Sequence, residues 1–266
     1  PIFGFNGSQI YTAEVTGLSK EKLHPKVSGT AKRLFMIYLV MSFSGIVALW
    51  LAGMSPFDAV NHALSTVSTG GFSTKNTSIA YWHSPAIEWI IIVLMTGSAI
   101  NLSLYYFLAV GNFRRFFKDE EMRTLIAIIV STAAIIVFTQ LIFWGFPLED
   151  IGENVRGALF TVSSLISTTG FYSVDYSGWI SVAYMLLLLT FVGGSAGSTS
   201  GGVKVIRVLL VFKYCYYEFK RMIHPHAVFP VRYNGRAVKE EYITRMLAFI
   251  LLYVILSLFG AMILCI

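Results

Sequence analysis

Five long apolar stretches that hold no charged residue constrain this chain more than any other feature of its sequence. Each is about twenty residues or longer, the length that an α-helix needs to cross a hydrocarbon core of about 30 Å. Only 13% of the residues are charged and 56% are hydrophobic, which excludes an ordinary soluble domain, a disordered chain and a collagen-like chain. The sequence therefore predicts an all-α membrane protein, with spans at residues 34–53, 89–110, 124–146, 179–203 and 246–266.

The basic residues predict how these spans are oriented. Eighteen of the 20 Lys and Arg residues fall in three segments, residues 1–33, 112–123 and 204–245. The other two connections hold one each, Lys75 and Arg156. Because cytoplasmic loops of membrane proteins carry the excess of Lys and Arg, we expect these three segments to be cytoplasmic loops. Topology then accounts for the net charge of +6, and we expect no nucleic-acid partner.

The two outer connections contain an internal repeat. Residues 54–88 open with Ser-Pro-Phe-Asp, a helix-start signature, and predict a short helix over 57–67 that is too brief to span a membrane. A second short helix is expected through residues 155–166. Both helices run into the string Ser-Thr-x-Gly-Phe, and the two copies are 99 residues apart. Each half thus has the order span, short helix, Gly turn, span.

This order favours a pore in which the strings bind an ion. A short helix that enters the membrane and returns leaves non-helical backbone at membrane depth, which is tolerated only inside protein or beside a wet cavity. Backbone carbonyl groups there can replace the hydration shell of a cation, and Gly71 and Gly170 suit the strained backbone that this requires. Ordinary Ser/Thr/Gly-rich turns are the alternative, which the repetition in equivalent positions disfavours.

A Gly-rich tract interrupts the fourth predicted span at residues 193–202. Its pattern fits neither a nucleotide-binding P-loop nor a dinucleotide-binding loop. Since each glycine costs a helix about 1 kcal/mol, we expect an unwound, mobile segment that lies below the strings and acts as a gate. The alternative is close helix packing, because Gly193, Gly197 and Gly201 recur at four-residue intervals.

The cytoplasmic segment that follows predicts a helix over 205–219 and a β-hairpin over 228–238 with an Asn-Gly turn. The histidines at 224 and 226 have no membrane-embedded histidine at ligand spacing, so we expect no metal or haem site there. The chain begins without Met and ends inside an apolar run, and we therefore expect it to be a piece of a longer membrane protein.

The repeated strings, the Gly-rich tract with Val-Lys-Val-Ile-Arg at 203–207, His-Pro at 224–225 and Val-Arg-Tyr-Asn-Gly-Arg at 231–236 occur together. In this combination the chain resembles the membrane subunits of the Trk/Ktr potassium-uptake family, over essentially its whole length. The resemblance implies four repeats around one pore. Residues 34–111 and 124–203 would be the second and third pore repeats, and 246–266 the first span of a further, truncated repeat.

The same resemblance implies roles for individual residues. The potassium-binding filter residues would be Thr69, Gly70, Gly71, Thr168, Thr169 and Gly170. The gate would comprise Gly193, Gly194, Gly197, Gly201, Gly202 and Lys204. It further implies potassium uptake across the bacterial cytoplasmic (inner) membrane, a homodimer, and a cytoplasmic nucleotide-binding regulatory subunit resembling TrkA. Potassium would be the substrate, bound through filter backbone atoms, with no covalently bound cofactor.

Two other classes of function remain to be weighed. A proton- or sodium-coupled secondary cation carrier normally shows carboxylates or histidines inside its spans, and the five predicted spans contain none. A membrane enzyme would need an acid–base constellation or paired histidines there, which are also missing from the spans, so we expect no enzyme. Thr and Gly carbonyl groups suit potassium and sodium alike, and only the resemblance favours potassium.

Overall fold

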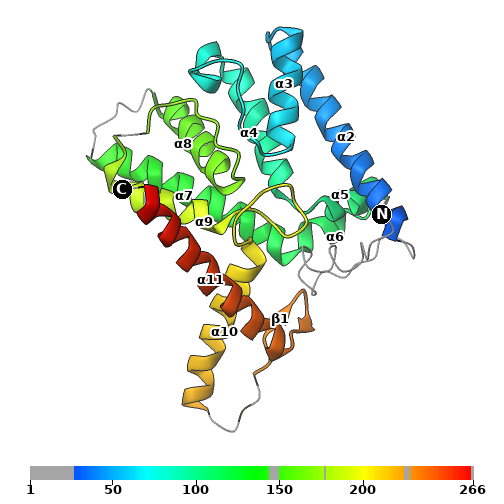
Figure 1. The fold of residues 1–266 in the computed structure, drawn as a ribbon, viewed down its shortest axis with the longest axis vertical. Helices are drawn as coiled ribbons and strands as arrows, with labels where there is room; N and C mark the ends of the chain where they lie inside the picture. Colours follow the sequence, from blue (N-terminus) through cyan, green and yellow to red (C-terminus); the bar gives the residue numbers. More distant parts are fainter. Residues whose placement is uncertain (1–26, 144–149, 177, 225–226, 228, 265–266) are drawn as a thin grey trace.

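The computed structural model describes residues 27–143, 150–176, 178–224, 227 and 229–264. Most of them are helical, in agreement with the predicted all-α class, and a single two-stranded hairpin occurs in the described part (Figure 1). Most of the predicted N-terminal loop, the start of the second short-helix connection and His226 lie outside the described residues.

The first half of the fold is built on α2 (Val27–Leu51), α3 (Pro56–Val67) and α4 (Pro85–Ala99), with the short 3₁₀ helix η1 (Ser78–Trp82) before α4. Helix α3 packs along α2 and α4 (Figure 1). It begins where the helix-start signature predicts: the Ser55 hydroxyl accepts a hydrogen bond from the Asp58 N–H at 3.1 Å and donates one to the Asp58 carboxylate at 2.9 Å.

The second half begins after α5 (Leu102–Ala109), at residue 113. It contains α6 (Phe113–Lys118), α7 (Glu120–Phe143), α8 (Ile151–Ile166), η3 (Ile180–Val182) and α9 (Ala183–Val192). The predicted second short helix corresponds to α8, which packs against α4, α7 and α9. An apolar core cluster lies here, and Leu125, Ile136 and Ile166 are fully buried in it.

Two predicted spans differ in the structure. The stretch 89–110 is not one straight helix: α4 ends at Ala99, α5 (Leu102–Ala109) follows, and the two are bent by 101°. The physical cause is local, because the Asn101 side chain accepts a hydrogen bond from the Ser103 N–H at 2.8 Å and so starts a new helix. The stretch 179–203 is helical only over η3 and α9, which together reach about 20 Å and are too short to cross a membrane alone.

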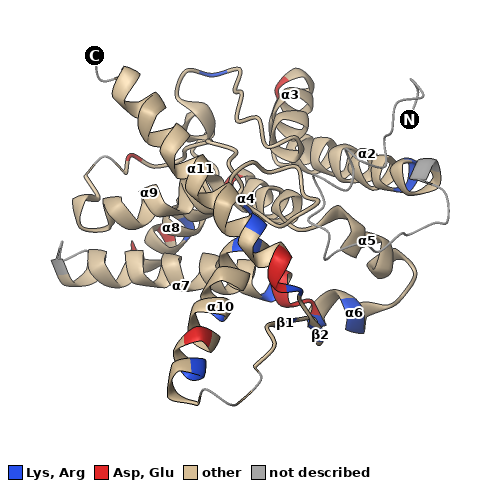
Figure 2. Ribbon diagram, turned by 60° about the horizontal axis from the view of Figure 1, so that its bottom comes forward, with Lys and Arg blue, Asp and Glu red and all other residues tan. Residues whose placement is uncertain are grey.

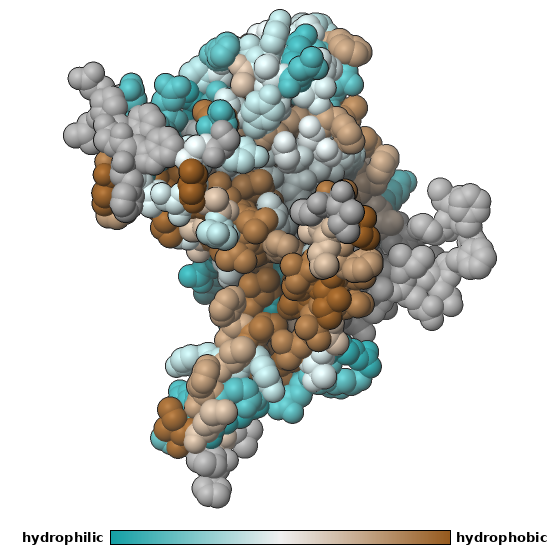
Figure 3. Space-filling view, turned by 60° about the vertical axis from the view of Figure 1, so that its left-hand side comes forward, coloured by the Kyte–Doolittle hydropathy of each residue, from teal (hydrophilic) through white to brown (hydrophobic). Residues whose placement is uncertain are grey.

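In the part of the chain that the structure describes, three helices are long and apolar enough to cross a membrane: Gly29–Leu51, Glu120–Ile142 and Glu240–Leu264. The bent pair of α4 and α5 would be a fourth if the two helices form one span. The three helices start four to six residues before the predicted spans. The third, α11 (Glu240–Leu264), has none of its apolar window buried inside the chain. Figure 3 shows an apolar area between more polar regions at both ends of the molecule. Such a surface is suited to lipid or to further membrane helices.

The predicted cytoplasmic segment forms α10 (Val205–Ile223) and a hairpin of β1 (Arg232–Tyr233) and β2 (Arg236–Ala237). The predicted Asn-Gly turn is confirmed, since both turn residues have positive φ, +46° and +77°. The hairpin rests on α10 and α11 through a small apolar cluster that includes Tyr233. Figure 2 shows basic residues gathered around α6, the hairpin and α10, as the expected orientation requires.

Candidate functional site

The first string, residues 68–72, ends α3 in a strained turn. Thr69 has φ +55°; its N–H donates to the Thr66 carbonyl at 3.0 Å, and the Gly70 N–H donates to the Ser65 carbonyl at 2.8 Å. These two bonds make a Schellman motif, in which the left-handed position is usually glycine. A β-branched residue in this position is unusual, and backbone strain of this kind concentrates at functional sites.

The second string, residues 167–171, ends α8 in the same way. Thr168 has φ +57° and its N–H donates to the Leu165 carbonyl at 3.0 Å. The Thr169 N–H donates to the Ser164 carbonyl, also at 3.0 Å. Both copies of the sequence repeat therefore adopt one backbone geometry, with a strained threonine as the first residue after the helix cap.

The two strings touch each other. Gly71 and Gly170 occupy equivalent positions and have φ of +69° and +84°. A Cβ atom built on Gly71 would lie 1.8 Å from the Thr169 carbonyl oxygen, whereas one built on Gly170 would meet nothing within 4 Å. Close approach of the Thr169 carbonyl group thus requires glycine at position 71 but not at position 170. At this contact the predicted residues Thr69, Gly70 and Gly71 meet the second set, Thr168, Thr169 and Gly170.

Residues 193–202, the Gly-rich loop, follow α9, and the two ends of the loop, Gly193 and Gly202, lie against each other. A Cβ atom on Gly202 would lie 2.7 Å from the Gly193 Cα, so glycine is needed where the two ends cross. The Val203 N–H donates to the Phe191 carbonyl at 2.9 Å and closes the loop. Because the loop is not helical, its regularly spaced glycines do not form a helix-packing face.

The Gly-rich loop fills the break between α4 and α5. The Ser195 N–H donates to the Ala99 carbonyl at 2.8 Å, and the Leu102 N–H donates to the Gly197 carbonyl at 3.1 Å. The backbone groups that lose their helical partners at the break are therefore hydrogen-bonded to the loop. Gly197, at φ +74°, fits closely here, since an added Cβ atom would lie 3.0 Å from Asn101 Oδ1.

The same loop is bonded to both strings. The Thr69 hydroxyl donates to the Thr199 carbonyl at 3.0 Å, and the Thr199 hydroxyl donates to the Val67 carbonyl at 2.8 Å. The Gly201 N–H donates to the Thr168 hydroxyl oxygen at 2.7 Å. The two strained threonines of the repeat are therefore the residues through which the strings hold the loop.

A comparison with known families identifies the chain. The family described as TrkH, cation transport protein, matches residues 1–265. The chain belongs to the TrkH family. This family transports cations and is not a family of enzymes, and its members are multi-pass membrane proteins. Among the described residues of this TrkH-family chain, no group of three or more His, Cys, Asp or Glu side chains could hold a metal ion.

Relatives and a solved structure agree with this assignment. The chain is 38% identical to the Trk system potassium uptake protein TrkH of Salmonella typhimurium over 91% of its length, and 37% identical to that of Escherichia coli K12, again over 91%. The crystal structure of the potassium transporter TrkH from Vibrio parahaemolyticus matches 94% of the chain with a TM-score of 0.83 and 34% identity, over 54% of that structure's chain. The TrkH-family chain spans about half the length of these relatives.

The remaining predicted gate residues meet at Ser200. The Gly194 N–H donates to the Ser200 hydroxyl oxygen at 3.1 Å, and the Lys204 ammonium donates to the Ser200 carbonyl. Lys204 has φ +82°, a further strained position at the inner end of the loop. All six predicted gate residues of this TrkH-family chain thus lie in one hydrogen-bonded segment or at its border.

One supporting residue of the TrkH-family chain is not singled out by the sequence. Glu121 is 2% exposed, and its Oε1 accepts hydrogen bonds from the Ala196 N–H at 2.6 Å and the Ile206 N–H at 3.3 Å. The sequence places this residue in the cytoplasmic loop 112–123. Its only sequence signal is a carboxylate three residues before a predicted span, which is too common to mark a site.

Proposed function

We propose that the chain contributes two repeats to a potassium-uptake pore of the bacterial cytoplasmic membrane. In this proposal the carbonyl groups of residues 68–72 and 167–171 replace part of the hydration shell of potassium. The C-terminal ends of α3 and α8 add the partial negative charge of a helix end. The names of the relatives, Trk system potassium uptake proteins, support potassium as the ion.

The observation that carries the proposal is the pair of strained threonines. Thr69 and Thr168 are 99 residues apart, share φ values of +55° and +57°, and both hydrogen-bond the Gly-rich loop. Ordinary surface turns do not require a costly backbone conformation in two places, or contacts of both turns with the Gly-rich loop. A selectivity filter requires both, because its carbonyl groups must keep fixed directions toward the ion.

The Gly-rich loop is the proposed gate. It is bonded to both strings and to the break between α4 and α5, which supports this role. In this proposal an ion that leaves the strings for the cytoplasm passes the loop. Its contacts are hydrogen bonds of a few kcal/mol in total, which a regulatory partner can exchange for others. A cytoplasmic nucleotide-binding subunit and a homodimer complete this proposal.

A flux measurement tests the proposal on the full-length protein in proteoliposomes. Gly197→Ala places a methyl group against Asn101 at a positive φ, and Gly260→Ala on α11 is the matched control, because its Cβ atom meets nothing within 4 Å. We expect Gly197→Ala to change the rate of potassium flux without changing the preference for potassium over sodium, and Gly260→Ala to change neither.

The driving force separates the pore from the secondary carrier. Potassium flux that follows the membrane potential in the absence of proton and sodium gradients supports the pore. Flux that requires either gradient would favour the carrier, and a changed ion preference in Gly197→Ala would contradict the separation of filter and gate.

A further inference from the structure

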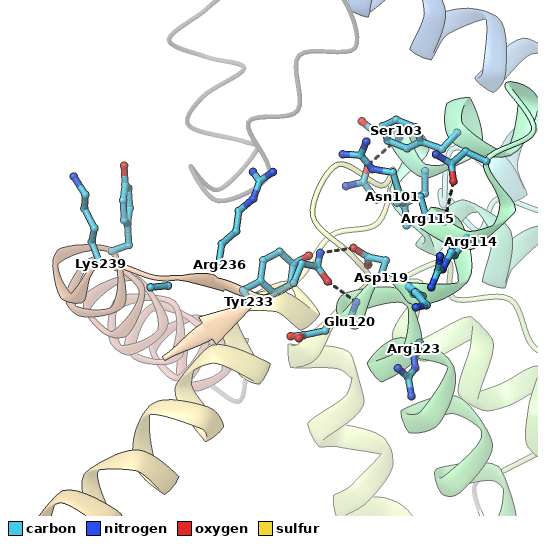
Figure 4. A pocket seen from close by; sticks show the side chains of 17 residues that line it. Asn101, Ser103, Arg114, Arg115, Asp119, Glu120, Arg123, Tyr233, Arg236 and Lys239 are labelled. Atoms are coloured by element: carbon cyan, nitrogen blue, oxygen red, sulfur yellow. Dashed lines mark hydrogen bonds between the residues drawn. The ribbon is translucent and has the colours of Figure 1, made fainter. Parts of the chain in front are cut away.

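A cavity of about 880 Å³ opens between the α6–α7 turn and the hairpin, on the side where the basic loops gather (Figure 4). Its walls come from segments that are far apart in the sequence: α5, α6, the first turn of α7, the hairpin and the start of α11. Two carboxylates line it, together with six basic side chains: Arg114, Arg115, Lys118, Arg123, Arg236 and Lys239.

The two carboxylates offset only part of this charge, because six basic side chains line the cavity against two acidic ones. Asp119 accepts a hydrogen bond from the Asn234 side-chain amide at 2.8 Å, and Glu120 is paired with Lys213 at 2.5 Å, outside the cavity lining. Within the described part of the chain, no ion pair involves five of the basic side chains: Arg114, Lys118, Arg123, Arg236 and Lys239. Like charges gathered in one concavity repel each other and create a field that attracts anions.

We propose that this cavity binds a phosphate-bearing ligand. Guanidinium groups fit phosphate oxygens with two parallel hydrogen bonds, and ammonium groups add charge without a fixed direction. The volume lies in the range of small-molecule sites, about 300–1,000 Å³. Potassium is disfavoured there, because a cation would have to approach six basic side chains that outnumber the two lining carboxylates. The cavity is therefore distinct from the ion path.

The cavity is fixed in shape by a residue that bridges its walls. Asn234, in the turn of the hairpin, accepts a hydrogen bond from the Glu120 N–H at 3.0 Å while its amide donates to Asp119. In Figure 4 both bonds are dashed lines that end on the labelled residues Glu120 and Asp119. The hairpin and the first turn of α7 are thereby joined across 114 residues of sequence. A preformed site pays less ordering entropy on binding than one that must assemble.

The cavity also borders the supports of the Gly-rich loop. Asn101 lines it and contacts Gly197, and Glu120 lines it beside Glu121, which holds the loop backbone. A bound phosphate group would lie next to both contacts. The binding itself does not depend on the proposed ion path, so it is measured without transport.

The ligand chemistry has two sources, a soluble oligophosphate or the headgroup of an anionic lipid. The first experiment measures the binding of one probe, sodium tripolyphosphate, to the full-length protein in nanodiscs of phosphatidylcholine. The second measures how much of the other probe, cardiolipin, the purified full-length protein retains. The cavity variant carries Arg114→Gln and Arg236→Gln. The control carries Lys220→Gln and Arg245→Gln, which removes the same charge from exposed positions outside the cavity.

We expect the cavity variant to bind at least one probe about tenfold more weakly than the wild type and the control to bind it as the wild type does. Weakened tripolyphosphate binding assigns a soluble ligand, and weakened cardiolipin retention assigns a lipid. Equal weakening in the control, or no binding of either probe by the wild type, overturns the proposal. Unchanged binding of both probes by the cavity variant overturns it as well. If that variant has also lost binding of the cytoplasmic subunit, the cavity is a protein-docking surface.

Discussion

The hydroxyl oxygen of Thr168 accepts a 2.7 Å hydrogen bond from the backbone N–H of Gly201. Its counterpart in the first string, Thr69, donates to the Thr199 carbonyl, so one loop is held by both copies of the repeat. The proposed filter and the proposed gate therefore share two hydrogen bonds. A change in either threonine should be felt by the loop.

Thr168→Val tests this link, because valine keeps the shape of threonine and removes the acceptor for the Gly201 N–H. Gly201 is exposed, so water can replace the bond, and the expected cost to the closed arrangement of the loop is about 1 kcal/mol, or about fivefold in its population. Potassium flux without the cytoplasmic subunit should rise accordingly. Thr168→Ser keeps the hydroxyl and serves as the control; equal flux in the valine variant, the serine variant and the wild type would remove the link.

Local signals in the sequence predicted the start of α3 correctly. The start of α3 depends on Ser55, Pro56 and Asp58, which act within one turn, and the structure has the predicted cap. The hairpin turn is equally local, since Asn234 and Gly235 tolerate positive φ where other residues do not. Features of this kind are decided by neighbours in the chain and can be predicted from one sequence.

The break between α4 and α5 could not be predicted in the same way. The local signal for the break is a single polar residue, Asn101, which lies between apolar residues on both sides. The bend is tolerable because Ala99 and Leu102 find hydrogen-bond partners in Ser195 and Gly197, almost a hundred residues later. The role of Glu121 could not be predicted for the same reason, since its partners Ala196 and Ile206 belong to another part of the chain.

The two glycines of the strings should respond differently to alanine, although the repeat makes them equivalent. Both have positive φ, which costs an alanine about 1–2 kcal/mol. Only at Gly71 does the added Cβ atom also collide with a backbone carbonyl, that of Thr169. Gly71→Ala should therefore lower the preference of the full-length protein for potassium over sodium much more than Gly170→Ala does. Competition of sodium with rubidium uptake measures this, and equal effects would show that the contact between the strings is not needed for selectivity.

Glu121→Ala should destabilise the Gly-rich loop strongly. The substitution leaves the N–H groups of Ala196 and Ile206 without their acceptor, and both residues are fully buried. Each unsatisfied donor costs about 1–3 kcal/mol, so the melting temperature of the purified protein should fall by several degrees. Glu121→Gln retains a carbonyl oxygen in the same place and is the control. If both variants melt together with the wild type, Glu121 does not support the loop.

Asp58 should make the outer end of α3 sensitive to acid. Its carboxylate accepts hydrogen bonds from the Thr74 hydroxyl at 2.6 Å and the Ser55 hydroxyl at 2.9 Å, with Lys75 3.7 Å away. The Thr74 bond is the main cause that holds the pKa of Asp58 below its ordinary value of 3.8. A lowered pKa in the folded state means that the ionised group stabilises the protein above pH 3.8, and that this stabilisation is lost as the pH falls through the folded-state pKa.

Thr74→Val should therefore lower the melting temperature at neutral pH, because a hydrogen bond to a charged group is worth about 1.5–3 kcal/mol. The variant should also lose less stability than the wild type on acidification below pH 3.8, since its Asp58 pKa lies closer to that of the unfolded chain. Thr77→Val is the matched control, because Thr77 is exposed and precedes η1 without a side-chain capping bond. Parallel pH profiles of the melting temperature for Thr74→Val, Thr77→Val and the wild type would show that the Thr74 hydroxyl does not tune Asp58.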